Sequence, residues 1–161
     1  SSFFEDMVAE VLALTGEDSS VKVRRVLRNS CMLSSDVSAA YDPLYPEVFE
    51  KKNTAYFGRG LVLNKYTGSR GKNGTSDANA EYVAKVRNVF DNNHVAFQTA
   101  ELGKVDQGGG GTIAYVMANK AMSVIDSGVA VLSMHAPYEV TSKSDIYEVY
   151  RGYKAFLKDM K

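Results

Sequence analysis

The sequence has little of several features whose scarcity excludes whole classes of protein. Its 161 residues include a single cysteine, so an internal disulfide framework is excluded. No apolar run reaches the roughly twenty residues that a membrane-spanning helix needs. Lys plus Arg number 19 and Asp plus Glu also number 19, so no excess of charge favours nucleic acid or an anionic membrane. We therefore expect neither as a partner.

The cysteine and the first residues set expectations about the compartment. Cys31 lies in an apolar run, which predicts a small buried core residue in a reducing, cytoplasmic environment. The opening stretch SSFFEDMVAEVLALTG has no basic start before an apolar block, so it predicts an amphipathic helix and not a signal peptide. The chain also does not begin with Met, from which we expect a processed or truncated product.

What remains is the composition of an ordinary globular domain, 45% hydrophobic and 24% charged. Hydrophobic periodicity predicts helices over residues 2–15, 77–92 and 112–119 and from about residue 144 onward. Strands are predicted over residues 26–35, 60–66, 95–102 and 122–132, the last one bent near Ser127-Gly128. This alternation predicts an α/β fold in one domain over residues 1–161, with a mixed, mostly parallel sheet and helices on both faces.

Two polar side chains follow predicted apolar strands. Residues 128–140 read GVAVLSMHAPYEV, so the apolar run ends just before His135, and Asp36 follows the strand over residues 26–35. Open α/β sheets bind ligands at the carboxyl ends of their strands, so these two side chains could converge on zinc or cobalt. Glu139 could serve as an outer partner of His135. A structural histidine, an N-cap aspartate and a plain loop carboxylate remain the alternatives, because two ligands are too few for a catalytic zinc.

Two loops could contact a ligand. Residues 107–112 read QGGGGT before a predicted helix, and exposed amides at such a point favour a phosphate or carboxylate. The run lacks the Walker lysine and the dinucleotide spacing, so a tight turn and a surface for substrate backbone stay open. Lys65, Arg70 and Lys72 form a small basic loop, which is either solvated or in contact with an anionic ligand or a neighbouring subunit.

Several of these motifs resemble the aspartyl aminopeptidase and vacuolar aminopeptidase I family. SSDVSAA at residues 34–40, followed by DPLYP at 42–46, is similar to that family's S-A-D-V-T-H-A and D-P-N-Y-P. GGTI at residues 110–113 resembles its G-S-T-I turn, and LSMHAP at 132–137 resembles its L-S-M-H-S. The matches are collinear over essentially the whole chain.

The resemblance implies a two-metal aminopeptidase that hydrolyses amino-terminal residues from peptides. The chain would be the carboxyl-terminal portion of a zinc-exopeptidase-like catalytic domain, in a large homo-oligomer when intact. Two divalent metal ions are implied, zinc with cobalt or manganese as alternatives, and of five ligands only Asp36 and His135 fall here, one on each metal. We also expect Gly110 and Gly111 to line the peptide substrate, and Lys65 to contact substrate or a partner.

The same resemblance implies limits on activity. The bridging Asp and the catalytic Glu would precede Ser1, so we expect the isolated 161 residues to be inactive. Ala39 stands where the family has His. GRGLVLN at residues 58–64 is similar to the family's G-K-G-P-V-I-K, so Asn64 stands where it has Lys, with Lys65 one residue later. We therefore expect a relaxed or neutral side-chain preference. The rival hypothesis is a non-catalytic binding or assembly module derived from the same fold.

Overall fold

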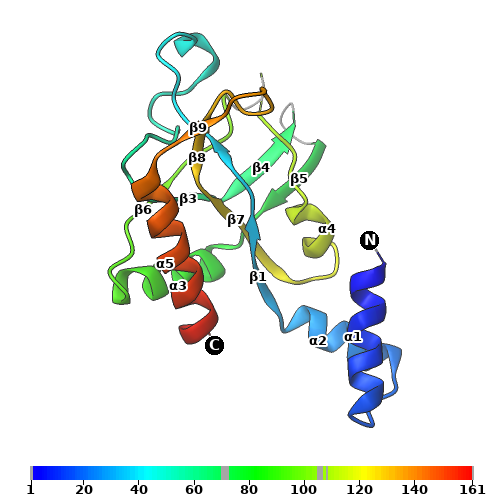
Figure 1. Ribbon diagram of the computed structural model, residues 1–161. Coiled ribbons are helices and arrows are strands. Elements are labelled where there is room, and N and C mark those ends of the chain that lie inside the picture. The colour runs from blue at the N-terminus through cyan, green and yellow to red at the C-terminus, as the bar shows by residue number, and fades with distance from the viewer. Residues whose placement is uncertain (1, 70–72, 105–106, 108, 161) are drawn as a thin grey trace.

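A four-stranded sheet forms the centre of the computed structural model, which describes residues 2–69, 73–104, 107 and 109–160 (Figure 1). Its strands lie in the order β1 (Cys31–Ser35), β7 (Ser123–Gly128), β3 (Leu61–Asn64) and β6 (Phe97–Thr99). The β1–β7 and β3–β6 pairs are parallel, whereas β7 and β3 are antiparallel. The mixed, mostly parallel sheet is therefore confirmed.

Two smaller sheets adjoin this centre. One contains β2 (Ser38–Ala39), β8 (Ala130–Leu132) and β9 (Val140–Thr141), and the other is a hairpin of β4 (Tyr66–Ser69) and β5 (Asn73–Asp77). Only Val129 separates β7 from β8, so the bend expected near Ser127-Gly128 is confirmed. Because β5 extends to Asp77, the helix expected from that residue begins instead at Ala80, where Asn79 caps it by accepting the Tyr82 N–H.

Helices lie on both faces of the central sheet, as predicted. On one face α3 (Ala80–Asn92) and α5 (Lys143–Asp159) enclose the main core, which includes Leu61, Leu63, Ile125, Val86 and Phe90. Successive strand residues point to opposite faces, so Asp126 points away from this core. The hairpin and α4 (Ala114–Ala118) lie over that second face. The long connection over 40–60 contains a short 3-10 turn, Pro46–Val48.

The first two helices bury almost nothing. The helices α1 (Phe3–Leu14) and α2 (Ser20–Arg28) pack against each other and lie apart from the sheet in Figure 1. No side chain of α1 is buried, and in α2 only Leu27 is. The predicted strand over residues 26–35 is therefore wrong in its first half, because α2 continues to Arg28 and β1 starts only at Cys31. None of the described helices is long and apolar enough to cross a bilayer.

Cys31 is exposed, so its assignment to the core was wrong. It is the first residue of β1, and β1 is an edge strand with a neighbour on one side only. The next residues of the run, Met32 and Leu33, are only half-buried, so the apolar run does not lie fully within the core.

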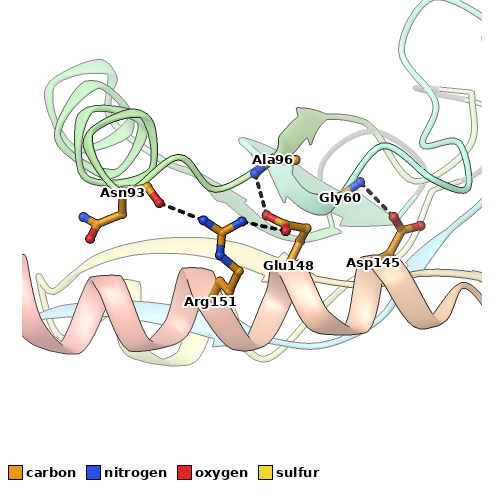
Figure 2. Close-up of polar contacts among 6 residues, drawn as sticks. All are labelled: Gly60, Asn93, Ala96, Asp145, Glu148 and Arg151. Atoms are coloured by element: carbon orange, nitrogen blue, oxygen red, sulfur yellow. Dashed lines mark hydrogen bonds and ion pairs between the residues drawn. The ribbon is translucent and has the colours of Figure 1, made fainter.

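A buried carboxylate at the start of α5 fixes the entry to β3 (Figure 2). Asp145 is 1% exposed and accepts the backbone N–H groups of Gly58 at 2.8 Å and Gly60 at 2.9 Å. Gly60 has φ +84°, and a Cβ there would lie 2.1 Å from the Ala96 carbonyl oxygen, so only glycine fits. The turn before β3 is thus locked both to α5 and to the segment that leads into β6.

The next turn of α5 fixes the entry to β6 in the same way. Glu148 accepts the Ala96 N–H at 2.7 Å, and Arg151 donates to Glu148 at 2.8 Å and to the Asn93 carbonyl at 3.0 Å (Figure 2). The helix α5 therefore fixes where the neighbouring strands β3 and β6 begin. The candidate site lies at the edge of the sheet formed by these strand starts.

Candidate metal and substrate site

Asp36 lies where the chain passes from the central sheet into the β2–β8 sheet. Its backbone N–H donates to the Ser127 carbonyl at 3.3 Å, and its exposed carboxylate accepts the Val37 N–H at 2.7 Å. A Cβ at position 128 would lie 1.4 Å from the Asp36 carbonyl oxygen, so this approach requires Gly128. The sequence thus places an accessible carboxylate on a tightly constrained stretch of backbone.

His135 lies in a turn just after β8. The turn is closed by the Ala136 N–H, which donates to the Ser133 carbonyl at 2.9 Å. Ser133 and His135 have φ of +58° and +69°. Residues other than glycine seldom adopt this left-handed conformation, and it is often found at functional sites. Glu139 accepts the backbone N–H of His135 at 2.6 Å. The expected partnership with Glu139 is therefore made through the backbone and leaves the exposed imidazole available.

The structure does not join the two predicted ligands directly. Asp36 lies beside Ser127, at the start of the β2–β8 pairing, whereas His135 lies beyond its far end. The strands that precede them, β1 and β8, belong to different sheets, because the long strand divides at Val129. Within the described ranges no group of three or more His, Cys, Asp or Glu side chains is placed to hold a metal ion. Carboxylate and imidazole suit zinc as donors, and assigning them as ligands remains a prediction.

The glycine turn packs against β4. Gly109 has φ +87°, and a Cβ there would lie 2.6 Å from the Gly68 carbonyl oxygen. Gly110 is half-buried beside Leu102, and Gly111 is exposed. Among the described residues, neither the Gly110 nor the Gly111 N–H has an acceptor. The turn is therefore tight, and the described residues leave its two amides without an acceptor. Gly108 lies outside the described residues.

Lys65 lies between β3 and β4 and forms an exposed ion pair with Asp77. Burial and the charge of Asp77 raise the pKa of Glu101, while Lys65 acts in the opposite direction. Asn64, at the position where the resembling family has Lys, is 4% exposed and lies against Ser38. The Lys65 side chain thus pairs with Asp77, a residue of the neighbouring hairpin. Arg70 and Lys72 lie outside those residues.

A cavity of about 230 Å³ borders the His135 turn. Its lining is largely apolar and includes Ala39, Phe49, Leu132 and Met134. Ala39 is the position at which the resembling family has His, so the substitution removes a polar group from the wall of this cavity.

Asp126, a buried carboxylate in the middle of β7, was not predicted from the sequence. It is 3% exposed and pairs across the sheet with Ser34 of β1 and Asn64 of β3, which makes a polar row across three strands. The Thr67 hydroxyl donates to its Oδ2 at 3.0 Å. Its Oδ1 and the Ser34 hydroxyl have no hydrogen-bond partner among the described residues. The available signal was an acidic residue inside an otherwise apolar strand.

Burial raises the pKa of Asp126 above its usual value. The hydroxyls of Thr112, Thr67 and Ser34 face the carboxyl and oppose that shift, whereas the negative charge of Asp36 adds to it. The predicted ligand and the overlooked carboxylate are thus electrostatically coupled.

The family described as aminopeptidase I zinc metalloprotease (M18) matches residues 1–157. The chain belongs to this family. It is 60% identical over 159 residues to the probable M18 family aminopeptidase 1 of Clostridium acetobutylicum, covering 99% of this chain and 34% of that protein. The crystal structure of an M18 aminopeptidase from Thermotoga maritima has a TM-score of 0.92 and 44% identity, covering 97% of this chain and 35% of that one. The resemblance and the fold class inferred from the sequence are confirmed.

The chain spans about a third of the length of the M18 relatives it matches, 34% and 35% in these two cases. A more distant structure, the dodecamer of mApe1 from Saccharomyces cerevisiae, has a TM-score of 0.68 at 22% identity and covers 92% of this chain and 33% of that one. At that identity the likeness shows the fold alone. The description of the M18 family as zinc metalloproteases supports zinc as the metal.

Proposed function

We propose that the complete protein carrying these residues removes amino-terminal residues from peptides with two divalent metal ions, and that this chain is the carboxyl-terminal portion of its catalytic domain. Membership of the M18 family carries this proposal. Asp36 would ligate one metal and His135 the other. Bound divalent ions supply Lewis-acid polarisation of the scissile carbonyl and lower the pKa of bound water.

The chain's own residues have three tasks in this proposal. Asp36 offers an exposed carboxylate on backbone fixed by Gly128, and His135 offers an exposed imidazole on a turn held by Glu139. The free N–H groups of Gly110 and Gly111 would hydrogen-bond the backbone of the peptide. These groups bind and orient, and none of them is placed to act as a general base.

The isolated chain should be inactive. A catalytic zinc normally has three protein ligands, and the described residues bring no group of three candidate side chains together. The remaining donors and the base would come from the part of the relatives' length that this chain does not span.

We further propose a neutral side-chain preference. The cavity beside the His135 turn is largely apolar, and Ala39 forms part of its wall. Neutral amino-terminal residues should therefore be cleaved with a higher kcat/KM than Asp or Glu. Comparison of matched leucyl and aspartyl substrates on the complete protein tests this, and a strong preference for the aspartyl substrate would contradict it.

We also propose that the complete protein is a large homo-oligomer. This proposal is supported by the exposed apolar side chains of α1, which include Phe4, Met7, Val11 and Leu14. Light scattering on the complete protein measures the assembly. The rival function, a non-catalytic module, would keep this assembly but have no peptidase activity.

The decisive experiment replaces each predicted ligand in the complete protein. Asp36→Ala and His135→Ala should each lower kcat by more than about a hundredfold and reduce the bound zinc measured by mass spectrometry. His94→Ala is the matched control, because His94 is also exposed and also has a positive φ, of +52°. Full activity and full zinc content in both ligand variants would rule out the assignment and favour the binding module.

A further inference from the structure

The glycine turn is attached to β4 at two neighbouring points. At one end, Gly109 lies against the Gly68 carbonyl, where a Cβ would be 2.6 Å away. At the other end, the hydroxyls of Thr112 and Thr67 lie 3.3 Å apart. Gly110 and Gly111 lie between these points, and their N–H groups have no acceptor among the described residues. Two amides that have no acceptor among the described residues therefore lie between two fixed contacts.

The Thr112 end of the turn is linked to a buried carboxylate through the Thr67 hydroxyl. The Thr67 hydroxyl donates to Asp126 Oδ2 at 3.0 Å, so its only proton is used. That proton is not available to Thr112, whose hydroxyl lies 3.3 Å from that of Thr67 and also faces the Asp126 carboxyl. Thr112 in turn accepts the Ala114 N–H at 3.3 Å, at the first residue of α4. The start of α4 is thus connected through two hydroxyls to the carboxylate of Asp126.

Asp126 is a rigid end point for this chain of bonds. It lies in the middle of β7 and is paired with β1 on one side and β3 on the other. Its side chain is 3% exposed and that of Thr67 is 2% exposed, so water does not compete for their bond. A structural buried carboxylate is expected to have both oxygens paired, but Oδ1 of Asp126 has no partner among the described residues. The sheet therefore holds a carboxylate that is costly to bury and whose second oxygen has no partner among the described residues.

We propose that Asp126 is a positioning residue which, through Thr67 and Thr112, holds the Gly109–Gly111 turn so that the Gly110 and Gly111 amides face a peptide substrate. The proposal rests on the peptidase function above and deepens it, because it assigns an origin to the geometry of the substrate surface. Asp126 itself does not touch substrate.

The test replaces the central hydroxyl of this chain of bonds in the complete protein. Thr67→Val removes the bond to Asp126 and keeps the side-chain shape, whereas Thr67→Ser keeps the hydroxyl. The matched control is Thr54→Val, because Thr54 is also buried, at 6% exposure, and its hydroxyl has no partner among the described residues. Thr112→Val breaks the same chain of bonds at a half-buried position, in case Thr67→Val does not fold.

Two readouts separate positioning from a general loss of structure. Hydrogen–deuterium exchange at the Ala114 amide, which is bonded to the Thr112 hydroxyl, should become about tenfold faster in Thr67→Val and Thr112→Val, with exchange in β1 and β7 unchanged. KM for a peptide substrate should rise several-fold while kcat changes less than about twofold, because ground-state binding is what the turn supplies. Thr67→Ser should restore both values, and Thr54→Val should alter neither.

Each contrary result has one meaning. Unchanged exchange at the Ala114 amide in both valine variants would overturn the positioning role. Faster exchange with unchanged KM would overturn the claim that the turn faces substrate. Absence of peptidase activity in the unmodified complete protein would refute the proposed function instead, and the exchange data would still decide whether Asp126 positions the turn.

Discussion

Asp145 and Asp126, the two aspartates buried among the described residues, show opposite ways of accommodating a carboxylate inside this fold. Asp145 is 1% exposed, and each of its oxygens accepts a backbone N–H. Asp126 is 3% exposed, and one oxygen accepts a hydroxyl while the other has no partner among the described residues. A satisfied buried carboxylate stabilises a fold, whereas a half-satisfied one costs stability.

Their positions explain the difference. Asp145 lies in the first turn of α5, where the helix dipole favours a negative charge, and it fixes the turn before β3. Asp126 lies in the middle of a strand, where no dipole compensates its charge, and burial raises its pKa. Asp145 therefore stabilises the fold, whereas the burial of Asp126 costs stability.

The largest loss of stability is expected from Asp145→Ala. The change removes two charge-assisted hydrogen bonds and leaves two backbone N–H groups near α5 without acceptors, which should cost about 4 kcal/mol. Urea denaturation of the complete protein measures the free energy of unfolding. Asp145→Asn should lose about half as much, because one amide oxygen can still accept one N–H. A loss below about 1 kcal/mol in Asp145→Ala would show that Asp145 is not the scaffold anchor.

A slightly smaller loss is expected from Gly128→Ala. The new Cβ would meet the Asp36 carbonyl oxygen at 1.4 Å, so the two strands must move apart, at a cost of about 3 kcal/mol. Because the movement displaces Asp36, bound zinc should also fall. Gly111→Ala is the control, because a Cβ there meets nothing closer than the Gly74 carbonyl oxygen at 3.9 Å. Equal unfolding free energies in the two variants would mean that the approach at Gly128 is easily relaxed.

Asp126→Asn should change the pH dependence of stability more than stability itself. The pKa of Asp126 is raised on folding, so above about pH 4 the folded state holds a proton that the unfolded state has already lost. Stability contributed by this group is therefore full at low pH and is lost as pH rises through the folded pKa.

Urea denaturation at pH 4 and pH 7 tests this sign. Asparagine cannot ionise, so Asp126→Asn should gain stability relative to the unmodified protein on going from pH 4 to pH 7. Thr67, Thr112, Ser34 and the charge of Asp36 face the group in both proteins. Parallel pH profiles would show that Asp126 keeps its ordinary pKa in the fold.

The smallest effect is expected at the exposed pair of Lys65 and Asp77. Both side chains are largely solvated, so Lys65→Met should change the free energy of unfolding by less than about 1 kcal/mol. Loss of the Lys65 charge should raise the pKa of Glu101 further, because Lys65 opposes its upward shift. An NMR titration of Glu101 measures this, and Lys22→Met, at the exposed pair with Glu17, is the control. A pKa of Glu101 that stays the same would place Lys65 out of its electrostatic range.

Patterns in the sequence were enough to predict the class of the fold and to identify the two ligand candidates. The apolar spacing within residues 77–92 and after residue 144 reports a helical period, and α3 and α5 follow it closely. The bend at Ser127-Gly128 was visible because glycine interrupts an apolar strand. Asp36 and His135 were identifiable because the motifs around them are local in the sequence.

Which side chains are buried, and which groups they contact, could be seen only in the folded structure. Cys31 looked like a core residue until β1 proved to be an edge strand, and the start of the predicted strand over residues 26–35 became part of α2. Asp126 could not be assigned a role, because its partners Thr67 and Thr112 are 59 and 14 positions away in the sequence. Periodicity describes one element at a time, whereas the state of a buried carboxylate depends on the elements packed against it.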